Sequence, residues 1–190
     1  PSSSPQLRPQ LQVPEFAPAA IAADSAIGAE FLAAVRPMAH SIAHGVSPST
    51  GVHRVVWTVD AEKLRNHERQ AVSPSFELPL GGGLVVSRLV LFPKPAAGAK
   101  GGASFKKSRG WGSVHLKCEA SAGSVIFQVS IGDGGGSFAR QPRGPVLHDF
   151  ADHSTCGLPK GSEYWDFGKA INRSAQTFAV CLDILPQGGP

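Results

Sequence analysis

Residues 114–119 read Val-His-Leu-Lys-Cys-Glu, with apolar and polar side chains in strict alternation. Successive side chains of a β-strand point to opposite faces, so this period of two predicts a strand with one buried and one polar face. The period returns over 125–131, which read Val-Ile-Phe-Gln-Val-Ser-Ile. Alternation with one polar face favours antiparallel sheets over a parallel sheet with helical crossovers.

Further short apolar stretches flank this region on both sides. We predict strands at 55–59, 76–78, 84–92, 146–150, 163–167 and 178–184. Breaks that contain Gly or Pro separate them, among them 81–83, 93–112, 132–136 and 157–161. Seven or eight short strands at this spacing predict a mainly β fold, an antiparallel β-sandwich over residues 51–186 followed by a tail at 187–190.

The composition narrows the class of protein. The chain has 190 residues, of which 42% are hydrophobic, and a formal net charge of +4. This length is typical of one domain with an attached arm. Since no run of about eighteen apolar residues occurs, we expect no transmembrane segment. The three cysteines, Cys118, Cys156 and Cys181, include no C-x-x-C pair, which excludes a disulfide framework and a zinc ribbon.

The first fifty residues differ from the rest. Residues 1–23 carry prolines at positions 1, 5, 9, 14 and 18 and few charges, which predicts an extended arm. Residues 24–50 are predicted to form one short helical segment and a linker. Asp24 is a suitable N-cap, and the helix is expected to kink at Pro37.

Apolar side chains in this N-terminal part recur at helical spacing. The residues concerned are Ile27, Phe31, Val35, Met38 and Ile42, at steps of four, four, three and four. Such a stripe either covers an open face of the following domain or docks on a partner protein. For the second alternative, the expected partner-binding residues are Pro9, Pro14, Phe16, Ile27, Phe31, Val35 and Met38.

Four short segments suggest a family. They are Val-Trp-Thr-Val at 56–59, Ser-Pro-Ser-Phe-Glu-Leu at 73–78, Leu-Val-Leu-Phe-Pro-Lys at 89–94, and Phe-Ala-Val-Cys-Leu-Asp-Ile at 178–184. In this order they resemble the landmarks of the meprin and TRAF homology (MATH) domain. The resemblance implies an eight-stranded antiparallel sandwich that binds peptides without catalysis. Trp-Asp-Phe-Gly at 165–168 stands where that family usually has Trp-Gly-Phe.

Polar side chains concentrate at 148–156, where His148, Asp152, His153 and Cys156 bring together imidazole, carboxylate and thiol groups. These are ligands for borderline metals, and Cys156 with His153 as base is a candidate nucleophile. A zinc site, however, needs four ligands, and no matching pair lies elsewhere. We therefore expect a polar strand end with turn-capping Asp side chains, no metal, no cofactor and no catalytic residue.

A second group of histidines has the spacing of a helical pair. His40 and His44 lie four residues apart, with His53 nearby in sequence. The H-E-x-x-H pattern of metalloproteases is missing, so we expect solvent-facing histidines on the predicted helix. The glycine-rich segments 81–83 and 132–136 match neither nucleotide-binding fingerprint and are interpreted as strand connections.

The stretch 94–109 is basic throughout. It carries Lys94, Lys100, Lys106, Lys107 and Arg109 and no acidic residue. A basic loop attracts anionic surfaces, so we expect either a solvated loop or one that docks on an acidic partner or another anionic surface. No motif for specific nucleic-acid recognition accompanies it.

These features favour a non-catalytic accessory or structural subunit that docks on a larger protein assembly through its arm and helix. Because the start of the chain is rich in Ser, Ala and Pro and poor in acids, as near organellar targeting segments, the expected host is a plastid membrane complex of the photosystem type, in the thylakoid. The alternative is a MATH-like peptide-binding adaptor in the cytoplasm. A third hypothesis is an enzyme or metal protein that uses the 148–156 cluster.

Overall fold

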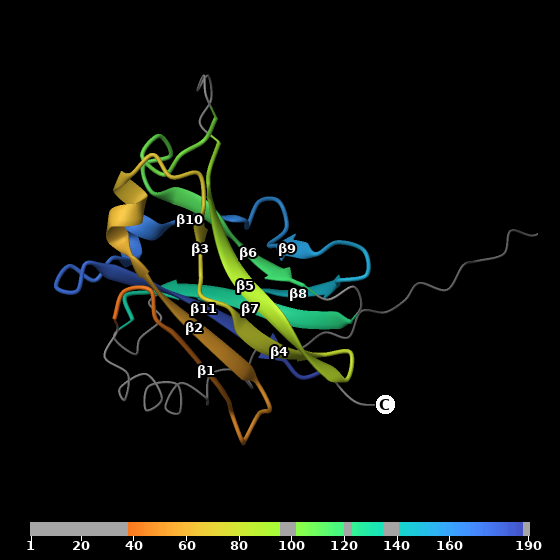
Figure 1. Ribbon diagram of the computed structural model, residues 1–190. Helices are drawn as coiled ribbons and strands as arrows, with labels where there is room; N and C mark the ends of the chain where they lie inside the picture. The colour runs from red at the N-terminus through yellow and green to blue at the C-terminus, as the bar shows by residue number, and fades with distance from the viewer. Residues whose placement is uncertain (1–37, 96–101, 120–122, 135–140, 188–190) are drawn as a thin grey trace, which may run out of the picture.

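The computed structural model describes residues 38–95, 102–119, 123–134 and 141–187. These residues form eleven strands and two short 3-10 helices (Figure 1): β1 Ile42–Val46, β2 His53–Asp60, η3 Ala61–Arg65, β3 Ala71–Val72, β4 Phe76–Leu80, β5 Gly83–Pro93, β6 Trp111–Cys118, β7 Ser124–Gly132, β8 Arg143–Asp149, β9 Thr155–Gly157, β10 Tyr164–Asp166, η4 Phe167–Ala170 and β11 Thr177–Leu185. Within the described ranges, no helix has the length and apolar character needed to span a membrane.

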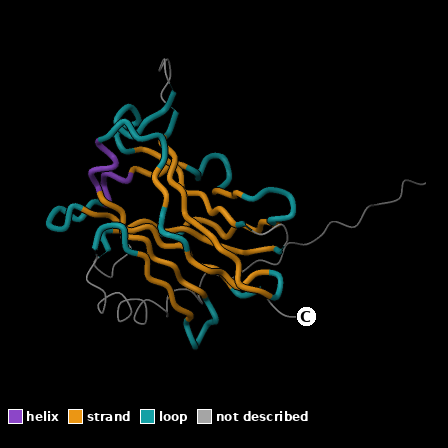
Figure 2. Tube along the Cα trace, viewed as in Figure 1, coloured by secondary structure: helices purple, strands orange, loops and turns teal. Residues whose placement is uncertain are grey.

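The strands form two open antiparallel sheets. Sheet 1 has the order β1-β2-β11-β7-β8, and sheet 2 has the order β10-β6-β5-β3, with β4 paired to β5 and β9 paired to β6. Figure 2 shows that strands predominate in the described residues and that the two short helices lie beside each other at one side of the molecule. The predicted mainly β character and antiparallel pairing are confirmed, in a β-sandwich-like arrangement.

One hydrophobic core joins the two sheets. Sheet 1 contributes Trp57, Phe127 and Leu182, and sheet 2 contributes Leu89 and Leu116, all of them buried. Along each strand the core residues alternate with residues on the opposite face, as the period of two predicts. Burial of large side chains from both sheets is the main favourable term that holds the sheets together.

The number of strands differs from the seven or eight predicted. β1, β3 and β9 are the additional ones, with five, two and three residues. Two or three residues, as in β3 and β9, show too few alternations to be recognised by periodicity, and in β1 the helical spacing from Met38 to Ile42 suggested a helix instead. Their backbones pair with longer neighbours, β2, β5 and β6, and this pairing rather than their own sequence makes them strands.

The predicted helix over 24–50 is wrong in its described part. Residues 42–46 form β1, with Ile42 opposite Trp57 of β2, so the sheet begins at 42 and not at 51. Pairing with β2 and packing of Ile42 against the core outweigh the helical spacing. Met38 is exposed, and His40, with φ +66°, shares no helical face with His44. The predicted arm at 1–23 and helix at 24–37 lie outside the described residues.

Candidate functional site

Aromatic side chains gather on the outer face of sheet 2. Phe92 of β5 lies opposite Ser113 of β6, which in turn lies opposite Tyr164 of β10, so the three residues share one face. Trp111 lies two residues before Ser113 and therefore on the same side. Phe92 is 36% exposed and Trp111 is 39% exposed, so both rings present part of their surface to solvent.

A lysine lies among these rings. The Nζ atom of Lys94 is 4.9 Å from the centroid of Tyr164 and 5.5 Å from that of Trp111, distances that fit cation–π contacts. The Lys94 backbone N–H donates to the carbonyl oxygen of Trp111 at 2.8 Å, which fixes the lysine beside the ring. We call Phe92, Lys94, Trp111, His115 and Tyr164 the aromatic face.

His115 extends the aromatic face toward β9. Its ring meets Phe92 edge to face, and its Nε2 atom lies 3.0 Å from the hydroxyl oxygen of Ser113. Burial lowers the pKa of His115, so the imidazole is neutral at pH 7. Gly157 lies opposite on β9, and a Cβ atom there would come within 2.9 Å of the His115 ring. The glycine thus provides the space in which the imidazole lies.

Both ends of the basic stretch 94–109 lie next to the aromatic face, since Lys94 belongs to it and Arg109 is two residues before Trp111. Phe105 is fully buried in the core, and its N–H donates to the Glu68 carbonyl at 3.1 Å, so residues 102–110 form a compact turn. Lys106, Lys107 and Arg109 are exposed on that turn, which leads directly into Trp111. The expected solvated loop is therefore anchored here. Lys100 lies outside the described residues.

The residues predicted at 148–156 are distributed over the end of β8, the following turn and β9. His148 contacts the carbonyl oxygen of His153 at 2.7 Å, while Cys156 lies on β9 and packs against the core. Burial raises the pKa of Cys156, so it stays a protonated thiol at neutral pH. Asp149, rather than Asp152, caps the turn by accepting the Ala151 N–H at 2.9 Å.

The potential metal ligands of the described residues lie apart from one another or in pairs. In the parts of the chain that the structure describes, no three His, Cys, Asp or Glu side chains come together as a metal site would require. His148, Asp152, His153 and Cys156 are thus not assembled into one ligand set. The pair His44 and His53, with ring centroids 5.9 Å apart, has no third such neighbour among these residues.

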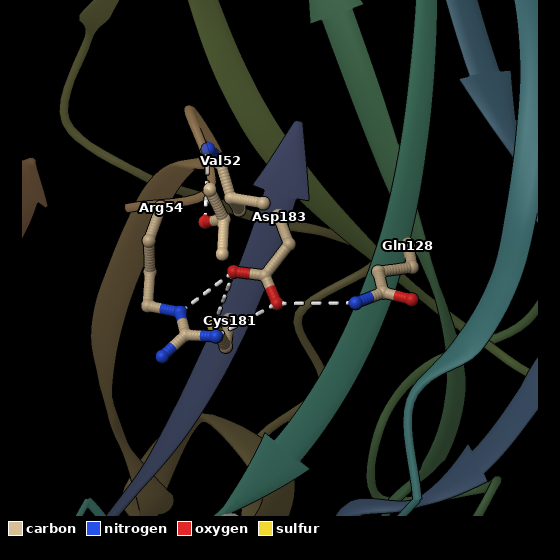
Figure 3. Close-up of polar contacts among 6 residues, drawn as sticks. Val52, Arg54, Gln128, Cys181 and Asp183 are labelled. Carbon is tan, nitrogen blue, oxygen red and sulfur yellow. Dashed lines mark hydrogen bonds and ion pairs between the residues drawn. The ribbon is translucent and has the colours of Figure 1, made fainter. Parts of the chain in front are cut away.

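Sheet 1 carries a buried polar network that sequence reasoning missed (Figure 3). Arg54 of β2 donates from Nε and Nη2 to the two carboxylate oxygens of Asp183 on β11, at 2.7 and 3.0 Å. Gln128 of β7 donates to Asp183 at 3.3 Å, and the Cys181 thiol donates at 3.6 Å. Asp183 is only 3% exposed. Burial and the neighbouring carboxylate raise the pKa of Cys181, so it remains a thiol.

An open cleft lies where the ends of the two sheets meet. Its volume is about 280 Å³, and Gly51, His53, Leu80, Ile184 and Gln187 are among its lining residues. Both ring nitrogens of His53 are buried without a hydrogen-bond partner. Burial, with a smaller contribution from His44, lowers the pKa of His53. An unpaired neutral imidazole in an otherwise mostly apolar cleft offers little recognition chemistry by itself.

The sequence held two signals for the aromatic face. Phe92 falls out of phase with the core residues Leu89 and Leu91, which places an aromatic ring on the solvent side of β5. Trp111 follows a basic stretch directly. Tyr164 gave no such signal, because only strand pairing brings it beside the others.

Comparisons with known proteins returned no matching family model and no significantly similar curated protein.

Proposed function

We propose that this chain is a non-catalytic binding module that docks on a partner protein through the aromatic face, as an accessory subunit of a larger assembly. The observation that supports this most is the grouping of Phe92, Trp111 and Tyr164 around Lys94 on an exposed sheet surface. Exposed aromatic residues beside a cation are typical of the residues that dominate binding energy at protein interfaces. Scattered single hydrophobic residues need no such explanation, but a contiguous patch does.

The charges of this surface indicate the chemistry of the partner. Lys94 lies on the aromatic face, and Lys106, Lys107 and Arg109 are exposed on the turn that leads into it. An acidic protein surface with an apolar side chain to pack on Phe92 and Trp111 would match both features. Charge complementarity of this kind mainly raises the association rate and makes that rate sensitive to salt, whereas the apolar contacts of Phe92 and Trp111 keep the complex together once it has formed.

The chemistry of the candidate nucleophiles supports a non-catalytic role. Burial raises the pKa of all three thiols, which disfavours the reactive thiolate. The Ser113–His115 contact has the geometry of a nucleophile and its base, yet Ser113 is buried beneath the aromatic face. Among the described residues, no carboxylate is bonded to the other His115 nitrogen, so the third member of a catalytic triad is not found there.

The second candidate function is a peptide-binding adaptor with a MATH-like sandwich. Its structural support is that the aromatic face runs over three adjacent strands, β5, β6 and β10, which gives an extended peptide several rings to contact. The two candidate functions differ in the lifetime of the complex with the partner. A subunit stays bound to its host, whereas an adaptor dissociates and binds again. A plastid host remains a prediction from the N-terminal composition.

The test compares partner recovery from the native source. The tagged full chain is purified under mild conditions, and the proteins that travel with it are measured by quantitative mass spectrometry. Replacing Trp111 with Ala should remove a binding hot spot worth about 2 kcal/mol, which is a loss of about 30-fold in affinity. The matched control is Leu147→Ala, because Leu147 is 71% exposed on β8 of the other sheet.

Two outcomes separate the alternatives. Partners that survive a salt wash and are lost only with Trp111→Ala support a stable subunit, while partners removed by salt support the adaptor. Equal recovery with the wild type, Trp111→Ala and Leu147→Ala would overturn the proposed role of the aromatic face.

A further inference from the structure

One end of the molecule brings together three segments that lie far apart in the sequence. η3 and residues 66–70 follow β2, whereas η4 and residues 171–176 precede its sheet neighbour β11, so both lie at the same end of sheet 1 (Figure 2). The turn 102–110 comes from sheet 2, between β5 and β6. Hydrogen bonds hold this turn against the other two segments, from the Lys106 N–H to the Asn66 carbonyl at 3.0 Å and from the Phe167 N–H to the Gly110 carbonyl at 3.1 Å.

This end is strongly basic, and we call residues 62–70, 106–109 and 168–176 the basic end. Its exposed charged side chains are seven cations and a single carboxylate, that of Glu62. Three of the cations belong to the turn, and the fold brings the other four beside them, namely Arg65, Arg69, Lys169 and Arg173. Elsewhere in the described ranges, four exposed carboxylates stand against three exposed cations. The positive charge is therefore concentrated at this end.

The composition of the basic end differs from that of a protein-binding surface. The centre of a protein interface is depleted in charged residues, and its binding energy comes largely from aromatic and other anchors that fill pockets. None of the large apolar side chains that are exposed in the described ranges lies within the basic end, since Phe92 and Trp111 belong to the neighbouring aromatic face. This polar character also argues against a membrane, because interfacial segments insert apolar side chains beside their cations. Protein–nucleic acid interfaces are instead polar and strongly positive.

We propose that the basic end binds the phosphodiester backbone of a nucleic acid without reading its sequence. Lysine and arginine neutralise backbone phosphates, and a guanidinium group donates to two phosphate oxygens at once. Asn66 and Gln70, both exposed, add uncharged side chains that hydrogen-bond phosphates and sugars. η3 and η4, with five and four residues, are too short to act as recognition helices in a groove. The contacts available are therefore those to the backbone.

The distribution of the cations fits a polymer rather than a single small anion. The segments of the basic end come from both sheets, and packed sheets lie about 10 Å apart. Charges spread over this width cannot enclose one phosphate or sulfate ion, whereas a nucleic acid presents phosphates at regular intervals along its length. Several cations can then contact phosphates at the same time.

This inference goes beyond the proposed function. The aromatic face lies on the outer side of sheet 2 and is assigned to a protein partner, whereas the basic end is formed where both sheets end. Because Lys106, Lys107 and Arg109 lie between the two surfaces, the test leaves them unchanged and replaces Arg65 and Arg173. Loss of nucleic-acid binding in that variant and loss of the protein partner in Trp111→Ala are thus separate results.

The test measures binding of the full chain to a fluorescein-labelled single strand of mixed sequence by fluorescence anisotropy. If about five cations contact phosphates, the affinity should fall about 100-fold between about 50 and 200 mM salt. Arg65→Glu with Arg173→Glu should weaken binding by about tenfold or more and flatten the salt dependence. The matched control is Lys117→Glu with Lys160→Glu, which changes the net charge equally on exposed side chains outside the basic end. It should retain most of the affinity.

Competition experiments separate nucleic acid from other anions. Unlabelled single strand and duplex of the same sequence should displace the probe, and their relative strength identifies the preferred form. Polyglutamate and vesicles of phosphatidylserine and phosphatidylcholine, added at the same concentration of charge, should displace it far less. The proposal would be overturned if the strand did not bind at low salt, if both double variants weakened binding equally, or if polyglutamate or the vesicles competed as well as the unlabelled strand.

Discussion

Phe92 and His115 meet edge to face on neighbouring strands of sheet 2, with ring centroids 5.1 Å apart and an interplanar angle of 89°. The contact links an exposed ring of β5 to a half-buried imidazole of β6. Because Gly157 leaves room for that imidazole, the shape of the aromatic face depends on a residue of β9 that carries no side chain.

Replacing Gly157 with Ala should disturb this arrangement. The new Cβ atom would lie 2.9 Å from the His115 ring, so the imidazole must move away from β9 and its contact with Phe92 must change. We expect a loss of about 1–3 kcal/mol in the free energy of unfolding and weaker partner recovery. Urea denaturation checks the first. Gly83→Ala is the control, since nothing lies within 4 Å of a Cβ atom there, and an equal effect of both changes would contradict the role of the ring contact.

Removing the charge of Lys94 should weaken association with an acidic partner. Lys94→Met keeps most of the apolar stem and removes the ammonium group that lies over Trp111 and Tyr164. We expect both a lower affinity and a flatter dependence of affinity on salt, because one charge fewer is screened. Titration of the partner over a salt series measures both. An unchanged salt dependence would show that Lys94 does not face the partner.

Replacing only Asp183 of the Arg54–Asp183 pair should lower the free energy of unfolding more than replacing both residues. In Asp183→Leu the Arg54 side chain, which is 24% exposed, loses its carboxylate partner, and we expect the free energy of unfolding to fall by about 1–3 kcal/mol. In the double variant Arg54→Met with Asp183→Leu, no unpaired charge remains, so much of the loss should be recovered. Chemical denaturation of the three proteins decides this. A double variant less stable than Asp183→Leu would refute the interpretation.

Acid should destabilise the protein through its buried histidines. The pKa of His53 is lowered by burial and by His44, so the unfolded chain binds a proton more readily than the folded one. The contribution of neutral His53 to stability is therefore fully present above the unfolded-state pKa of about 6.5. It is lost as the pH drops below that value toward the folded-state pKa. His53→Phe should flatten this decline between pH 7 and pH 5 in thermal unfolding. An identical pH profile for the variant would exclude His53 as a source.

Much of the fold was predictable from alternation, because strands such as β6, β7 and β11 are long enough to show a period of two. Periodicity gave the wrong element at Ile42, where the spacing from Met38 predicted a helix. In the structure, the pairing of Ile42 with Trp57 places it in a strand. Local sequence cannot encode such an outcome, since it depends on a strand eleven or more residues further along the chain.

The candidate site was only partly predictable. Lys94 was recognised from the charge of its stretch, but its neighbours Tyr164 and His115 come from strands far away in the sequence. The anchoring of the basic stretch by Phe105 was missed, because a single aromatic residue among glycines and lysines gives no periodic signal. The Arg54–Asp183 pair was also missed, because the two residues come together only when β2 and β11 pair.

The position of β11 has a consequence for biosynthesis. This strand, Thr177–Leu185, lies in the middle of sheet 1 between β2 and β7, although both of those are made well before it. As the chain leaves the ribosome, β2 and β7 each keep an unpaired edge until β11 has been synthesised and can pair with both. Such non-local closure is slow, and open strand edges attract other chains. Protection of the nascent chain by a chaperone would therefore matter most in the interval before residue 177 emerges.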